Sequence, residues 1–165
     1  PKIFLEETKR VLKIMNLYVW TNKNLLLEYL QFARDNKYSF DVLLHLKPNP
    51  VPVNNHHYLT DKEYIVFIKG PKATFNSKLG YPNYFTYYSH PIGGKNKISK
   101  HPTEKWIDPI KKWIQISSNE GDLVLDPYCG SGTTLQAAKD LGRRWIGIDN
   151  TKEWTDFSNL RLNQS

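Results

Sequence analysis

Hydrophobic positions in this chain follow two spacings, and each spacing predicts a different kind of element. In residues 107–116, four large apolar side chains recur on one face of a helix. Residues 63–69 instead form a β-branched and aromatic run that ends at Gly70-Pro71, which is typical of a strand. The same patterns predict helices at 3–13, 25–34, 133–141 and 153–162, and strands at 18–20, 38–46, 123–125 and 145–149.

The order of these elements predicts the fold class. Strands that alternate with helices indicate an α/β fold with a mainly parallel sheet and helices on both faces. Thr21 or Asn22 would cap the helix at 25–34. Residues 48–52, with three prolines, predict an extended loop, and residues 71–100 look irregular. The length of 165 residues predicts a single domain over 1–165.

The turn after the strand at 123–125 carries the strongest chemical signal. Residues 124–134 read Val-Leu-Asp-Pro-Tyr-Cys-Gly-Ser-Gly-Thr-Thr, so an acid ends a strand, two glycines follow and a helix opens. Glycines let a backbone pass close to a ligand, and a helix N-terminus presents unpaired N–H groups. Asp149 ends the next strand, where nucleotide-binding units keep an acid for ribose hydroxyls. The expected ligand contacts are Asp126, Pro127, Tyr128, Gly130, Ser131, Gly132, Thr133, Thr134 and Asp149.

The spacing of this turn admits two ligands. A dinucleotide site has a third glycine, but Leu135 stands at that position and opposes close packing of helix on strand. S-adenosylmethionine has no pyrophosphate and does not need that glycine, so the segment favours this cofactor. The alternative is a glycine turn that binds nothing, which the acids at both strand ends argue against.

Three motifs together point to a family. His101-Pro-Thr-Glu-Lys105, Leu125-Asp-Pro-Tyr-Cys-Gly-Ser-Gly-Thr-Thr134 and Ile146-Gly-Ile-Asp149 resemble the amino-methylating DNA methyltransferases, in particular the circularly permuted β group. This resemblance implies a Rossmann-like, S-adenosylmethionine-dependent methyltransferase fold and a cofactor-binding half at 101–165. It also implies cofactor contacts from His101, Thr103 and Lys105, although a plain turn capped by Thr103 is an alternative. The implied reaction is methyl transfer to the exocyclic amine of adenine (N6), or less readily cytosine (N4), in double-stranded DNA.

The chain departs from this family in one important respect. The catalytic tetrapeptide Asp/Asn/Ser-Pro-Pro-Tyr/Phe occurs nowhere in the 165 residues, so no catalytic residue can be assigned. We expect a fragment that lacks the N-terminal catalytic strand, with a homodimer or a partner supplying the missing segment. The main rival is a non-catalytic DNA-binding or assembly module that keeps the cofactor pocket. A nicotinamide-dependent oxidoreductase is a weaker rival.

The candidate DNA contacts are basic and aromatic. The net charge of +7 suggests a polyanionic partner. Residues 71–100 contain lysines and aromatic residues and no acid, which predicts a DNA-recognition insertion in which lysines meet phosphates and aromatics meet bases. Aromatics that only pack on the domain are the alternative. The Lys47-Pro-Asn-Pro50 loop is a second candidate, with a rigid polar loop as the alternative. The predicted contacts are Lys47, Asn49, Lys72, Lys78, Tyr84, Tyr87, Lys95 and Lys97.

Composition adds a few limits. No apolar run is long enough to span a membrane, and the one cysteine, Cys129, rules out an internal disulfide and suits a reducing cytosol. The family resemblance implies a cytoplasm of bacterial, phage or archaeal type. Cys129 is expected to be a small residue fitted to the loop and not a catalytic thiol. His56-His57 has no further ligands in a zinc pattern, so no metal is expected.

Overall fold

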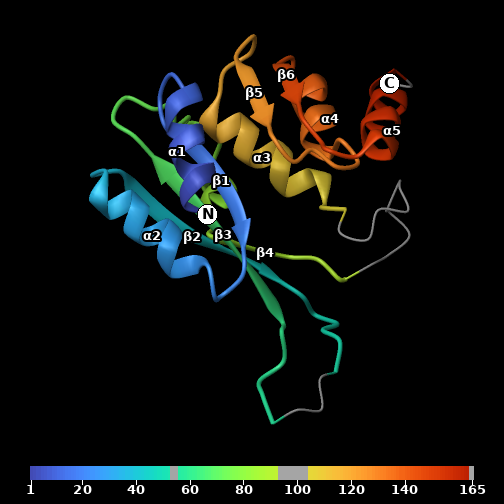
Figure 1. The fold of residues 1–165 in the computed structure, drawn as a ribbon. Helices are drawn as coiled ribbons and strands as arrows, with labels where there is room; N and C mark the ends of the chain where they lie inside the picture. The colour runs from blue at the N-terminus through green and yellow to red at the C-terminus, as the bar shows by residue number, and fades with distance from the viewer. Residues whose placement is uncertain (53–55, 93–103, 164–165) are drawn as a thin grey trace. The chain divides into compact units, whose positions relative to one another are not determined.

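The computed structural model describes residues 1–52, 56–92 and 104–163 (Figure 1). The chain divides into two compact units. The first consists of Pro1–Ala73 and Tyr84–Ile92, and the second of Thr74–Asn83 and Gly93–Ser165. The predicted insertion at 71–100 therefore contributes residues to both units.

The first unit contains a four-stranded sheet in the order β1-β3-β2-β4. Strand β3 is antiparallel to both β1 and β2, while β4 is parallel to β2. The sheet is thus mixed and not mainly parallel as expected. The reason is that the segment 47–61 joins β2 to β3 with no helix among its described residues, so the chain returns in the opposite direction. The strands are β1 (Asn16–Thr21), β2 (Ser39–Leu46), β3 (Lys62–Lys69) and β4 (Tyr87–Ser89).

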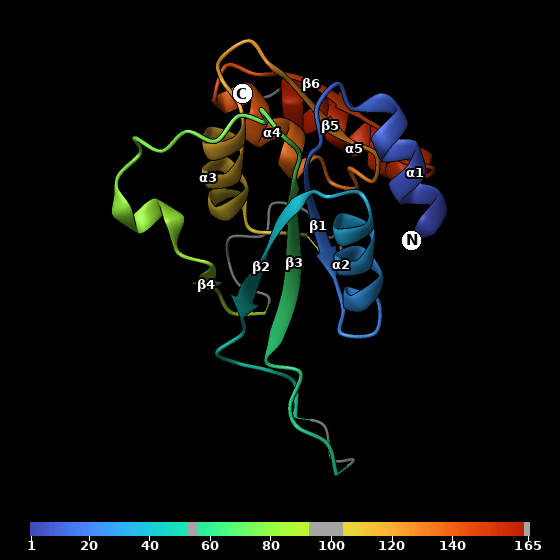
Figure 2. The same ribbon diagram turned by 90° about the vertical axis from the view of Figure 1, so that its left-hand side faces the viewer.

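Helices α1 (Lys2–Val11) and α2 (Leu26–Asp35) cover one face of this sheet (Figures 1 and 2). Strand residues alternate between faces, so Val66 and Ile68 of β3 point toward these helices and are fully buried. They pack with Leu5 of α1 and Ala33 of α2. The predicted cap is not found at the helix start itself, because Leu25 is the N-cap residue of α2 and makes no side-chain cap bond. Asn22 instead holds the preceding turn, where its side-chain oxygen accepts the N–H groups of residues 24 and 25 at 2.9 and 3.2 Å.

The second unit holds a parallel pair of strands, β5 (Leu123–Asp126) and β6 (Arg144–Gly147), and three helices. Helix α4 (Thr133–Asp140) packs against both strands, α3 (Ile107–Ser117) and α5 (Lys152–Asn163). Lys111 of α3 forms an ion pair with Asp140 of α4. This strand-helix-strand unit has the parallel arrangement that the sequence predicts.

Two short elements lie in the region predicted to be irregular. Residues Tyr81–Tyr84 form the 3-10 helix η1, and β4 adds to the edge of the first sheet. Both are too short to produce a recognisable periodicity, which explains why the sequence pattern did not indicate them. Within the described part of the chain, no helix has the length and apolar character needed to cross a membrane.

Candidate functional site

The acids predicted to bind a ligand lie at the carboxyl ends of the two parallel strands. Asp126 pairs in register with Gly147, and the Ile148 N–H donates to the Asp126 carbonyl at 2.9 Å. The Cys129 N–H in turn donates to the Ile148 carbonyl at 2.9 Å. The glycine turn and the segment that carries Asp149 are therefore joined along one edge, which is where open α/β sheets bind ligands.

Both carboxylates also organise the backbone around them. One Asp149 oxygen accepts the Gly130 N–H at 3.0 Å, and the other accepts the Thr151 N–H at 2.9 Å. Asp126 accepts the N–H of Tyr128 at 3.1 Å. A carboxylate offers about four acceptor positions, so a bond to a backbone N–H is compatible with a further bond to a ligand hydroxyl. Asp149 is thus a structural residue of the turn as well as a candidate ligand contact.

The two glycines of the turn adopt positive φ angles, 47° at Gly130 and 75° at Gly132. A Cβ added at Gly132 would lie 2.9 Å from Oγ of Ser158, a residue of α5. Backbone conformation and the packing of α5 both require glycine at 132. The sequence argument, which assigned this requirement to a bound ligand, therefore missed the role of α5.

Helix α4 packs closely on strand β6 because the strand, and not the helix, carries a glycine at the contact. A Cβ on Gly147 of β6 would lie 2.3 Å from Cδ1 of Leu135 and 3.1 Å from Sγ of Cys129. Leu135 is buried in α4 and fills the space above Gly147. The inference that leucine at 135 opposes close packing was wrong in its reason, because the glycine that permits the contact lies on β6.

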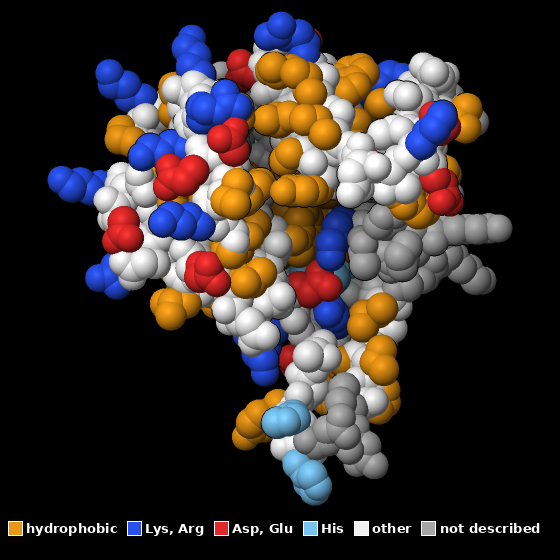
Figure 3. Space-filling view, viewed as in Figure 1, with side chains coloured by type: hydrophobic (Ala, Val, Ile, Leu, Met, Phe, Trp, Pro, Cys, Tyr) orange, Lys and Arg blue, Asp and Glu red, His pale blue; other side chains and the backbone are white. Residues whose placement is uncertain are grey.

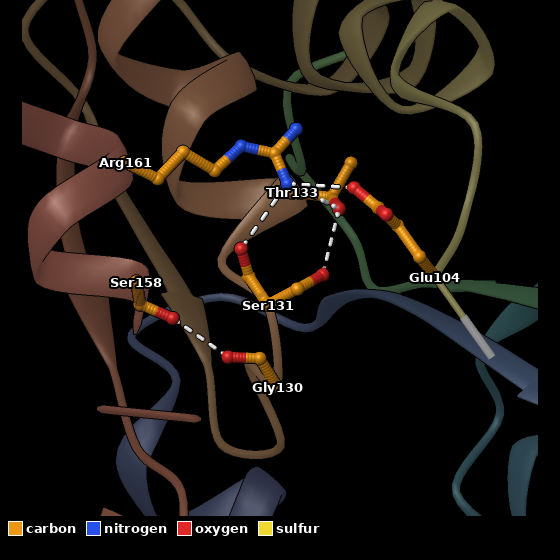
Figure 4. A network of polar contacts seen from close by, with 6 residues as sticks. All are labelled: Glu104, Gly130, Ser131, Thr133, Ser158 and Arg161. Carbon is orange, nitrogen blue, oxygen red and sulfur yellow. Dashed lines mark hydrogen bonds and ion pairs between the residues drawn. The ribbon is translucent and has the colours of Figure 1, made fainter. Parts of the chain in front are cut away.

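A buried arginine joins the turn to α5 and to the segment before α3 (Figure 4). Nη1 of Arg161 lies 2.9 Å from Oε1 of Glu104, 3.1 Å from the Ser131 carbonyl oxygen and 3.2 Å from Oγ1 of Thr133. The Arg161 and Glu104 side chains are only 6% and 4% exposed. One turn earlier on α5, Ser158 donates its hydroxyl to the Gly130 carbonyl at 2.6 Å. Helix α5 therefore supports the glycine turn from behind at two points.

Cys129 is buried in a small cluster with Leu135 and Leu162. Burial raises the pKa of its thiol, and the negative charges of Asp126 and Asp149 raise it further. A protonated, buried thiol is a poor nucleophile. These surroundings support the packing role expected from the sequence.

The remaining predicted cofactor contacts differ in exposure. Tyr128 is 74% exposed, whereas Ser131, Gly132 and Thr133 are buried. Pro127, Thr134 and Lys105 are half-buried. His101 and Thr103 lie outside the described residues. The described cofactor candidates from 126 to 149 are thus brought together around the ends of β5 and β6.

The predicted DNA contacts fall into two groups. Lys47 forms an ion pair with Glu63, and Asn49 is hydrogen-bonded to the backbone of Ile92. Lys72, Lys78 and Tyr87 are exposed and Tyr84 is half-buried, while Lys95 and Lys97 lie outside the described residues. Figure 3 shows Lys and Arg side chains projecting from the surface among acidic ones, and His side chains at the tip of the loop between β2 and β3.

Comparison with known proteins decides the family. Residues 2–159 match the DNA methylase family of N6 and N4 methyltransferases. The chain belongs to this family. The N6/N4 methylase resemblance seen in the sequence is thereby confirmed.

Individual relatives agree with this membership. The N6/N4 methylase chain is 31% identical to the type II methyltransferase M2.MboI of Moraxella bovis, over 81% of the chain and 54% of that protein. It is 51% identical to M2.DpnII of Streptococcus pneumoniae over 38% of the chain and 24% of that protein. The chain therefore spans about half the length of the first of these relatives and a quarter of the second.

Solved structures confirm the fold class. The crystal structure of the M1.HpyAVI-SAM complex matches with a TM-score of 0.74 and 32% identity, covering 90% of this chain and 74% of that one. PvuII DNA methyltransferase, described as cytosine-N4-specific, matches with a TM-score of 0.66 at 16% identity, over 83% of this chain and 56% of that one. At that identity the second likeness shows the fold alone.

Five residues of the site regions were given no role from the sequence. They are Ser158, Arg161 and Glu104 beside the glycine turn, and His45 and Glu63 on the first sheet. Glu104 entered only as part of the His101–Lys105 motif. A charged residue at a buried helix position could have signalled Arg161, because charged side chains are buried only when paired.

Proposed function

We propose that this N6/N4 methylase chain binds S-adenosylmethionine at the carboxyl ends of β5 and β6 and that the protein methylates an exocyclic amine in DNA. The target is adenine N6, or less readily cytosine N4. The methyl group passes from the sulfonium of the cofactor to the ring amine. Because that amine is a poor nucleophile, the enzyme must hold the base and accept hydrogen bonds from the amine.

The observation that carries the cofactor proposal is the convergence of two strand ends, the glycine turn and the N-terminus of α4. The Asp149 carboxylate is the group that would accept the ribose hydroxyls, and its bonds to the Gly130 and Thr151 N–H groups hold it in place. Amides in the first turn of α4 have no acceptor within the helix and suit the carboxylate of the cofactor. M1.HpyAVI, at 32% identity, has been crystallised with SAM, which supports the same ligand here.

Titration calorimetry tests this proposal directly. The chain should bind S-adenosylmethionine and its demethylated product, and should not bind NADH. Asp149→Asn keeps one side-chain oxygen for the turn but removes the charge. We expect affinity to fall by about 10- to 150-fold, as for loss of hydrogen bonds to a charged acceptor worth about 1.5–3 kcal/mol.

A matched control separates the ligand contact from general damage. Asp156 is an exposed acid on α5 that pairs with Lys152 at 2.7 Å, so Asp156→Asn should leave cofactor affinity unchanged. Binding of NADH without S-adenosylmethionine would overturn the cofactor proposal.

The DNA proposal rests on the lysines and aromatics of residues 71–100. Phe85 and Tyr87 are 44% and 53% exposed and stack with centroids 5.8 Å apart, so aromatic surface is available to bases. Lys72 and Lys78 are exposed cations. Replacing the lysines of this segment by Ala should flatten the plot of log K against log salt by about 0.9 for each phosphate that is no longer neutralised. An unchanged slope would place the DNA surface elsewhere.

Methyl transfer requires the tetrapeptide that the 165 residues do not contain. We propose that another segment, in the same polypeptide or in trans, supplies it. The alternative is a non-catalytic module that binds cofactor and DNA. A labelled-methyl assay separates them. The chain alone should be inactive, and the N-terminal segment of a relative added in trans should restore transfer only if the chain serves an enzyme.

A further inference from the structure

Segment Tyr84–Ile92 is held to the first unit by a very short ladder. Strand β4 pairs with β2 in parallel over only Leu44↔Tyr87, His45↔Tyr88 and Leu46↔Ser89. Two backbone bonds flank the pairing, from Leu44 N–H to Thr86 O at 2.8 Å and from His90 N–H to Leu46 O at 3.1 Å. Parallel pairing is slightly less stable per residue than antiparallel pairing, so three residue pairs stabilise the position of the segment only weakly.

The side chain of Asn49 extends this ladder. Its amide nitrogen donates to the Ile92 carbonyl at 3.1 Å, and its oxygen accepts the Ile92 N–H at 2.7 Å. A side-chain amide offers the same donor and acceptor as a peptide group. Pro48 and Pro50 on either side have no N–H to contribute. The Asn49 amide nitrogen therefore supplies a donor beside two residues that have none, and its oxygen adds an acceptor.

The Glu63 carboxylate of β3 lies beside His45 of β2 without a hydrogen bond to its Nδ1, and the same His45 ring contacts the end of the segment. Glu63 of β3 lies opposite His45 of β2, with its oxygens 3.5 Å from His45 Nδ1 and 3.2 Å from Lys47 Nζ. Nε2 of His45 lies 3.0 Å from the carbonyl oxygen of His90, so this nitrogen carries the proton and donates it. The His45 ring also stacks on Tyr88, with centroids 4.6 Å apart and planes 6° apart.

The burial of Lys47 bears on what its charge can do. Its side chain is only 14% exposed, and its ammonium group already faces the Glu63 carboxylate. A phosphate would have to compete with that carboxylate. The amide nitrogen and oxygen of Asn49 both face Ile92 in the same way. Lys47 and Asn49, the two predicted DNA contacts in this loop, thus already bind partners within the protein.

We propose that Lys47, Asn49 and Glu63 are positioning residues that fix segment 84–92 against β2, and that they present its exposed aromatics to DNA without contacting DNA themselves. This inference rests on the proposed function for its DNA consequence. It assigns to the Lys47-Pro-Asn-Pro50 loop a supporting role in recognition.

The substitution Glu63→Gln distinguishes the two roles by sign. If Lys47 binds a phosphate directly, loss of the Glu63 charge removes a competitor and a repulsion, so DNA should bind more tightly. If Glu63 anchors the segment, the same change leaves Lys47 buried beside a neutral partner, and DNA should bind more weakly. We expect about a 5- to 20-fold loss, comparable with that of Lys47→Met and of Asn49→Ala.

The binding experiment uses the 165-residue chain and a mixed-sequence duplex of about 30 base pairs, followed by fluorescence anisotropy across a salt series. Lys47→Met should lower affinity while leaving the salt slope unchanged, because the number of neutralised phosphates stays the same. The double variant Lys47→Met/Glu63→Gln should be no weaker than either single variant, because a neutral pair leaves no buried charge unpaired. Lys62→Met, which removes an exposed lysine from the same strand, is the matched control.

Hydrogen exchange without DNA tests the anchoring independently. The amides of Leu44, His90 and Ile92 should exchange about 5- to 10-fold faster in the Glu63, Lys47 and Asn49 variants, and unchanged in Lys62→Met. Tighter DNA binding by Glu63→Gln, a lower slope in Lys47→Met, or unchanged exchange in all three variants would overturn the proposal. If the wild-type chain does not bind the duplex at all, the proposed function fails, while exchange still decides whether these residues hold the segment.

Discussion

The buried ion pair between Arg161 and Glu104 offers a sharp test of the second unit. Glu104→Gln removes the carboxylate charge but keeps the shape of the side chain. The arginine then retains the Ser131 carbonyl and the Thr133 hydroxyl as acceptors but loses the Glu104 carboxylate. Because the two side chains are 6% and 4% exposed, water cannot replace the lost partner.

The expected cost follows from this burial. Breaking a buried pair by removing one partner costs about 3–5 kcal/mol, whereas exposed pairs contribute about 0–1 kcal/mol. For a chain of this size each kcal/mol lowers Tm by about 2–4 °C, so Glu104→Gln should lower Tm by about 6–20 °C. The double variant Glu104→Gln/Arg161→Met removes both charges and should recover most of that loss.

Urea unfolding followed by circular dichroism and by tryptophan fluorescence measures the effect. Lys152→Met is the control, since its pair with Asp156 is exposed, and it should change the unfolding free energy by less than about 1 kcal/mol. The reasoning would be refuted if Glu104→Gln changed the unfolding free energy by less than about 1 kcal/mol. It would also be refuted if the double variant lost as much unfolding free energy as the two single variants together. Cofactor affinity of Arg161→Lys should fall as well, because the lysine ammonium is not a rigid planar group and does not hold its donors in the fixed position of Nη1 between the three acceptors.

Three further predictions concern the same unit. Gly132→Ala should lower the unfolding free energy by about 1–3 kcal/mol, because φ is 75° there and the new Cβ meets Ser158; urea denaturation measures it. Cys129 should react slowly with a thiol reagent at about pH 7 and rapidly once the protein is unfolded in urea, because burial and the nearby acids raise its pKa. Burial alone would raise the pKa of Asp140, but hydrogen bonds from Lys111 and Gln136 lower it below its ordinary value. The contribution of ionised Asp140 to the free energy of unfolding should therefore be complete above pH about 4 and lost as pH falls through the lowered pKa. The difference in unfolding free energy between the wild type and Asp140→Asn should accordingly shrink toward zero in acid. A difference that persists in acid would show that this carboxylate is not paired.

Helix and strand positions followed largely from the sequence, because apolar spacing reports which face of an element is buried. The helices at 107–116 and 153–162 and the strand at 63–69 were found within about two residues of their predicted ends. The glycine turn and its two acids could also be predicted, because glycines in a turn and carboxylates at strand ends are features of short sequence segments. Family membership followed from the same local motifs and was confirmed by comparison.

Tertiary structure decided what those residues touch. Strands β2 and β3 are antiparallel because of the path that the chain takes between them. The spacing of apolar residues within either strand carries no information about that path. Leu135 faces Gly147, Arg161 reaches Glu104, and Glu63 captures Lys47, although the members of each pair lie well apart in the chain. From the sequence, Lys47 and Asn49 read as groups available to DNA. The fold supplies each with an internal partner, because the charge or backbone group that pairs with a polar side chain comes from whichever element the fold brings beside it.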